Sequence, residues 1–75
     1  MTKFQMLYAI AKDCIDDEYK ARCFAFRAKE HKTVEEVKRL HDEWQSGTKP
    51  KEYFKMEIIG YTETKKNVYI KNHSE

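Results

Sequence analysis

Glycine and proline are scarce in this chain, which contains two glycines and one proline among 75 residues. Both residue types interrupt regular structure, so their scarcity indicates a chain built mainly of regular elements. A glycine-rich phosphate-binding loop is excluded, because Gly47 and Gly60 stand alone. Long apolar runs are missing as well. Residues 6–11 are apolar, but a membrane span needs about 20 such residues. No segment has the layout of a signal peptide, so we expect a cytoplasmic protein with no membrane partner.

Cysteine is also rare, and the spacing of Cys14 and Cys23 does not predict a disulfide. On one helix they would lie about 13 Å apart, at roughly 1.5 Å per residue. On a hairpin turning near residues 15–16, Cys14 would lie beside the turn and Cys23 well down the second strand. Two reduced thiols indicate a reducing compartment. We expect Cys23 to be buried and unreactive, and Cys14 to lie nearer the surface.

Motifs for catalysis and metal binding are absent too. The cysteines and histidines show neither Cys-x-x-Cys nor His-x3-His spacing, so no zinc site is expected. The acidic run Asp13, Asp16, Asp17 and Glu18 lacks the alternating ligands and central glycine of a calcium loop, and it predicts a solvated turn. The candidate nucleophiles carry no catalytic signature, because Cys23 is expected to be buried and Ser46 precedes Gly47 only where a helix ends. We therefore expect no catalytic residues, no cofactor and no metal, and the protein is not expected to be an enzyme.

Residues 33–46 carry the clearest pattern in the chain. Thr33 and Glu36 form a capping box at the start of a helix, and Gly47 is a suitable end. One apolar stripe recurs at helical spacing between these points. Its members are Val34, Val37, Leu40, His41 and Trp44. The sequence predicts an amphipathic helix with a single face to bury.

The rest of the chain favours strands. Residues 52–62 alternate between apolar and polar, residues 64–67 form a polar turn, and residues 68–71 return as a second strand. In residues 19–29 the composition favours helix, but the apolar side chains would surround a helix axis. Residues 4–10 also alternate. We predict one α+β domain over residues 1–75, ββαββ, with one amphipathic helix packed on an antiparallel sheet.

The alternative fold is ααββ, with a helix pair before the capped helix. In the preferred fold the capped helix packs its stripe against the inward side chains of the C-terminal hairpin. Leu40 and Trp44 are expected to contact these side chains. The expected contacts are Phe54, Met56, Ile58, Val68 and Ile70.

The uncovered face of such a sheet is the expected binding surface. Aromatic side chains there can anchor a protein partner, with lysines around them. The predicted partner-binding residues are Tyr53, Lys55, Ile59, Tyr61, Tyr69 and Lys71. A second candidate surface would bind phosphates, with tyrosines stacking on bases. It consists of Lys20, Arg22, Arg27, Lys29 and Lys32.

In small size, high lysine and tyrosine content and lack of enzymatic motifs, the chain resembles the small accessory proteins that bacteriophages make to modulate host machinery. This resemblance rests on size class and composition and covers no motif. It implies a cytoplasmic, non-enzymatic inhibitor or modulator that acts by occluding a partner's surface. The leading expectation is therefore a protein–protein interaction module. The alternatives are a small nucleic-acid-binding regulatory protein and a homodimeric structural module.

Overall fold

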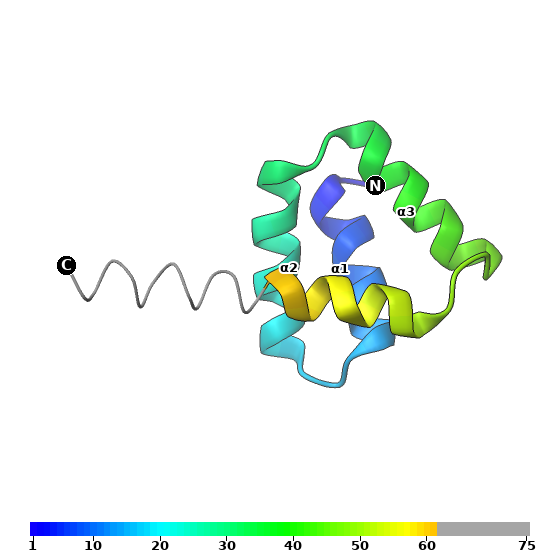
Figure 1. Ribbon diagram of the computed structural model, residues 1–75. Helices are drawn as coiled ribbons and strands as arrows, with labels where there is room; N and C mark the ends of the chain where they lie inside the picture. The colour runs from blue at the N-terminus through cyan, green and yellow to red at the C-terminus, as the bar shows by residue number, and fades with distance from the viewer. Residues whose placement is uncertain (62–75) are drawn as a thin grey trace.

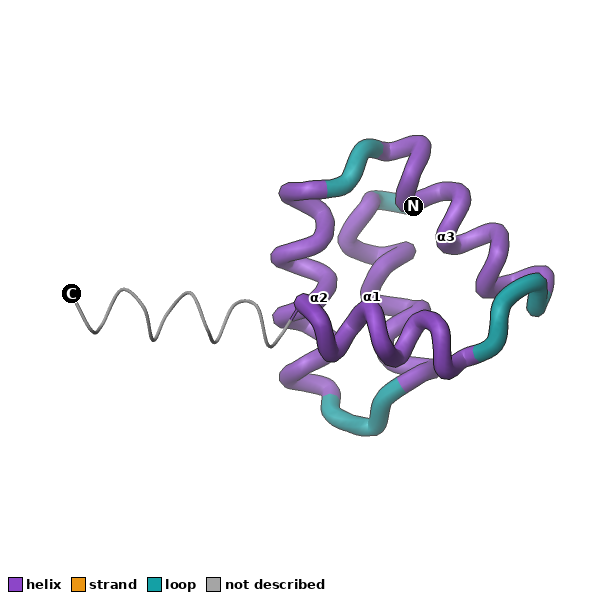
Figure 2. The backbone as a smooth tube through the Cα atoms, viewed as in Figure 1, coloured by secondary structure: helices purple, strands orange, loops and turns teal. Residues whose placement is uncertain are grey.

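The computed structural model describes residues 1–61, and every regular element in this part is a helix (Figure 2). Helix α1 spans Lys3–Cys14, α2 spans Glu18–His31 and α3 spans Val34–Ser46. A further helix runs through residues 51–61 and is called the C-terminal helix below. Residues 1–61 contain no strand, so the expected ββαββ fold is wrong. The strand half of the ααββ alternative is wrong over residues 52–61 for the same reason.

Helix α1 begins at a capping box that the sequence analysis overlooked. The Thr2 hydroxyl accepts from the Gln5 backbone N–H, and the Gln5 side chain accepts from the Thr2 backbone N–H. The buried residues then recur at helical rather than alternating spacing. They are Met6, Leu7, Ile10, Ala11 and Cys14. The alternation over residues 4–10 arose because Phe4 and Tyr8 lie half-buried on a second side of the same helix.

Helix α2 begins where Asp17 accepts a hydrogen bond from the Lys20 backbone N–H. Its buried side faces the core. That side consists of Ala21, Phe24, Ala25 and Ala28. The strand expected over residues 19–29 is wrong, because this segment is helical and carries apolar residues on both its buried and its exposed sides. The alanines and Phe24 are buried, whereas Tyr19 and Phe26 are exposed, so apolar residues occur all round the helix.

Helix α3 confirms the helix expected over residues 33–46. Both hydrogen bonds of the Thr33–Glu36 capping box form, and Gly47 ends the helix at φ 73°. This left-handed conformation suits glycine. Val37 and Leu40 are buried and Trp44 packs against the same core. Val34, in the first turn, is 44% exposed and lies outside the core.

The C-terminal helix replaces the strand expected over residues 52–62. Its start follows Pro50, whose carbonyl accepts from the Tyr53 backbone N–H at 3.1 Å. Phe54 and Ile58 are buried four residues apart, as on one side of a helix, and both join the core that contains Leu40. Met56 is 74% exposed, so it does not contact α3 as expected. Val68 and Ile70 lie outside the described residues.

Asp13 ties three helices together at one end of the fold. The Trp44 indole Nε1–H donates to Asp13 Oδ2 at 2.8 Å, and Lys51 Nζ donates to Oδ1 at 3.2 Å. These hydrogen bonds, that of Trp44 first, lower the pKa of Asp13 below its ordinary value of 3.8. In Figure 1 the C-terminal helix (yellow) passes in front of α1 and ends beside α2. The bond from Lys51 joins the start of this helix to the end of α1, but the Lys51 side chain is 64% exposed, so this pair adds little stability.

Truncating Leu40 to alanine tests the packing of α3. Leu40 is 8% exposed, and removing its buried methyl groups should cost about 2–5 kcal/mol of unfolding free energy. Val34→Ala on the same helix is the matched control, and it should cost about 0.5 kcal/mol or less. Denaturant unfolding measures both. Equal destabilisation by the two substitutions would show that the buried side of α3 is assigned wrongly.

Candidate binding surface

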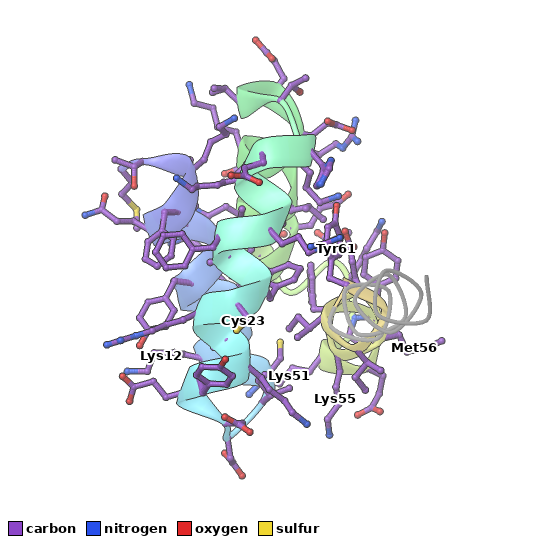
Figure 3. The ribbon with its side chains drawn as sticks, turned by 90° about the vertical axis from the view of Figure 1, so that its left-hand side faces the viewer. Lys12, Cys23, Lys51, Lys55, Met56 and Tyr61 are labelled. Atoms are coloured by element: carbon purple, nitrogen blue, oxygen red, sulfur yellow. The ribbon has the colours of Figure 1, made fainter. Side chains whose placement is uncertain are left out.

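The outward side of α2 carries a line of large apolar side chains. Tyr19, Cys23 and Phe26 recur at intervals of four and three residues, which aligns them on one side of a helix. Tyr19 is 76% exposed, Phe26 is 55% exposed and Cys23 is partly exposed. In Figure 3, Cys23 lies on the side of α2 that faces the viewer. We call these three residues the α2 ridge.

Aromatic rings extend this surface from α2 onto α1. The ring centroids of Phe26 and Phe4 lie 4.6 Å apart, and Phe4 stacks on Tyr8 at 5.6 Å. Lys29 Nζ lies 5.5 Å from the Phe26 centroid, and Lys12 Nζ lies 5.5 Å from the Tyr8 centroid. Both distances suit cation–π attraction. The result is a continuous aromatic surface with cations at its edge.

Basic residues follow the α2 ridge on both sides. Lys20 and Arg27, seven residues apart, share one side, and Arg22 and Lys29 share the other. Arg22 pairs with Glu18 at 3.2 Å, but both side chains are 60% exposed, so this pair adds little stability. The candidate phosphate-binding residues on α2 are therefore divided between two sides. They do not form one basic patch.

Lys32, the fifth candidate phosphate ligand, has a structural partner instead. Its Nζ lies 2.8 Å from Glu57 Oε1 and 5.6 Å from the centroid of the Tyr61 ring. Burial disfavours the charged ammonium, but the hydrogen bond and charge of Glu57 outweigh burial and raise the pKa of Lys32. Lys32 thus holds the C-terminal helix against the end of α2.

A groove of about 520 Å³ lies between α2 and the C-terminal helix. It is lined by Arg27, His31, Glu57, Gly60 and Tyr61. The Tyr61 ring meets Phe24 edge to face at 5.4 Å and packs against the core. Figure 3 shows Tyr61 on the α2 side of this helix and Met56 on the opposite side. Tyr61 therefore does not share an exposed surface with Tyr53, Lys55 and Ile59, the predicted partner-binding residues of the same helix.

The remaining predicted partner-binding residues lie on the outer side of the C-terminal helix or beyond the described part. Tyr53 is 41% exposed, Ile59 is 45% exposed, and Lys55 is exposed. Lys49 Nζ covers the Tyr53 ring at 4.2 Å. Tyr69 and Lys71 lie outside residues 1–61. The expectation of one sheet face joining these residues is wrong, because residues 52–61 are helical.

Sequence reasoning missed the α2 ridge, although two signals were present. Asp17 precedes the helix as a capping residue, and the spacing of Tyr19, Cys23 and Phe26 is that of a helical stripe. The alternating positions of the basic residues suggested a strand instead. Among the described residues, the two most exposed aromatic side chains, Tyr19 and Phe26, thus lie on α2.

The two cysteines are free and their burial is the reverse of the expectation. Cys14 is buried on α1, and burial raises the pKa of its thiol, with a further contribution from the negative charge of Asp13. Cys23 lies on the outward side of α2. The free thiols therefore occupy two different environments, one inside the core and one within the α2 ridge.

Within residues 1–61, no three side chains of histidine, cysteine, aspartate or glutamate gather in a way that could hold a metal ion. None of the described helices combines the length and hydrophobicity that a membrane crossing requires. Comparison of this chain with protein-family models, curated proteins and solved structures found no match in any of the three.

Maleimide labelling of the native protein tests the exposure of the α2 ridge. We expect one adduct to form rapidly at Cys23, while Cys14 reacts only slowly, because a buried thiol with a raised pKa contains little thiolate. Cys23→Ser should abolish the rapid phase and Cys14→Ser should leave it intact, as followed by intact-protein mass spectrometry. A rapid phase that disappears with Cys14→Ser would contradict this arrangement of α1 and α2.

Proposed function

We propose that this protein is a small, non-enzymatic protein–protein interaction module that acts by covering a surface of its partner. The observation that carries the proposal is the α2 ridge together with the rings of Phe4 and Tyr8 beside it. Tyrosine and phenylalanine bury much area for little loss of side-chain freedom, and aromatic residues are enriched among the residues that dominate binding energy.

The exposed aromatic residues of α2 are separate from the residues that hold the helix in place. Ala21, Ala25 and Ala28 have no exposed surface and supply the packing side. Tyr19 lies on the other side, with 76% of its surface exposed. A large side chain that contributes little to the core but stays on the surface supports a role in contact with another molecule.

The layout of the basic residues favours a protein over a nucleic acid as this partner. The basic residues of α2 lie on both sides of the ridge, whereas a phosphate backbone is best met by one continuous basic stripe. We therefore place the nucleic-acid alternative second.

Capture of a partner from cell lysate by the tagged full-length protein tests the proposal. The double substitution Tyr19→Ser/Phe26→Ser should remove capture, since anchor residues typically cost about 2 kcal/mol or more when truncated. Nuclease treatment of the lysate should leave capture by the wild-type protein unchanged. Circular dichroism confirms that each variant is folded.

The matched control is Tyr53→Ser/Met56→Ser, which removes exposed apolar area from the C-terminal helix. It should retain capture, because those side chains lie on a different helix from the α2 ridge. Full capture by the folded Tyr19→Ser/Phe26→Ser variant would contradict the proposal. Loss of capture after nuclease treatment would favour the nucleic-acid alternative.

A further inference from the structure

We infer that the α2 ridge binds an acidic amphipathic helix of a partner protein. The inference rests on the proposed function, to which it adds the shape and charge of the partner. Three independent features of α2 carry it, namely the spacing of the ridge, a hollow within it, and the charges on its two sides.

The spacing of the ridge is the spacing that helices use to pack on helices. Tyr19, Cys23 and Phe26 follow one another at intervals of four and three residues, and Glu30 continues the series four residues later. This alternation of four and three is the repeat of a coiled-coil seam, in which side chains of one helix enter gaps on the other. A strand or an irregular loop has no matching repeat.

A hollow in the ridge has the form of one such gap. It has a volume of about 130 Å³ and is lined by Cys23, Phe26, Arg27 and Glu30. These positions are i, i+3, i+4 and i+7, the four residues that surround a side chain inserted from a facing helix. The hollow is open at the surface of α2, so one apolar side chain of a partner helix can enter it.

The charges beside the ridge determine which charge the flanking residues of a partner helix should carry. Lys20 and Arg27 lie on one side, and Arg22 and Lys29 lie on the other. The acidic residues on this exposed part of α2 are fewer, namely Glu18 and Glu30. In helix pairs the residues flanking the seam select partners by charge. Four cations against two anions favour a helix with glutamate or aspartate beside its apolar seam.

The same charges argue against a second copy of this chain as the occupant. A two-fold dimer places the same surface on both sides of the interface. Packing α2 on α2 would therefore bring the cations of one copy close to those of the other. Juxtaposed like charges disfavour such a complex, whereas an acidic helix replaces this repulsion with attraction.

Two synthetic amphipathic peptides test the inference with the full-length protein. Both have the same leucine seam and differ only in the flanking residues, which are glutamate in one and lysine in the other. Fluorescence anisotropy at low salt should show the acidic peptide binding at least about tenfold more tightly. Raising the salt concentration should narrow this difference, because the flanking charges are exposed and become screened.

Charge-reversal substitutions test whether the cations beside the α2 ridge cause the preference for the acidic peptide. Lys20→Glu/Arg27→Glu should weaken binding of the acidic peptide about tenfold, the free-energy scale of a few exposed ion pairs. Lys38→Glu/Arg39→Glu makes the same change in net charge on the exposed side of α3 and should leave the affinity nearly unchanged. Circular dichroism of both variants excludes loss of folding as the cause.

Equal affinity for the two peptides, no binding of either, or equal effects of the two charge reversals would overturn the inference. Light scattering that shows a dimer, with dissociation by Phe26→Ser, would identify a second copy as the occupant and also overturn it. If Tyr19→Ser/Phe26→Ser abolishes partner capture but Lys20→Glu/Arg27→Glu does not weaken capture, the α2 ridge binds a partner but the inferred acidic charge of that partner is wrong. If that double substitution leaves capture intact, the proposed function itself fails.

Discussion

The close packing of α2 on α1 is the constraint on which the described fold depends. Ala21, Ala25 and Ala28 are completely buried on α2, as is Ala11 on α1. Side chains this small let two helix backbones approach closely, and a close-packed interior tolerates little added volume. The Lys3 ammonium reinforces the pair by donating to the carbonyls of residues 29 and 32 at the end of α2, at 2.8 and 3.0 Å. The remaining helices close the core around this pair.

The sequence predicted α3 but not its neighbours, and the difference lies in how many signals agree. In α3 the cap at Thr33, the stripe and the end at Gly47 all indicate the same helix. In the C-terminal helix, Phe54 and Ile58 satisfy both an alternating and a helical period, and only the exposure of Met56 separates the two. Residues 52–61 are too few to distinguish these periods from the sequence alone.

The sequence predicts a different aromatic surface from the one that the described residues present. An exposed aromatic surface beside basic residues was expected on a sheet that included Tyr53 and Tyr61. The described part instead presents it on α2 and α1, with Tyr61 turned towards Phe24. The cause is the same alanine packing. Because Ala21, Ala25 and Ala28 occupy the buried side together with Phe24, Tyr19 and Phe26 are left outside, a division that hydrophobicity alone does not reveal.

Thermal unfolding of the two variants Ala25→Leu and Tyr19→Ala tests most directly the claim that α2 packs its alanines into the core and leaves Tyr19 outside. Ala25 has no exposed surface, so the added volume should cost about 1–3 kcal/mol. In a domain of this size, each kcal/mol lowers Tm by roughly 4–8 °C. Tyr19→Ala removes a far larger side chain, yet it should change stability by about 0.5 kcal/mol or less because Tyr19 is 76% exposed. A Tm lowered strongly by Tyr19→Ala and unchanged by Ala25→Leu would show that α2 turns its other side to the core.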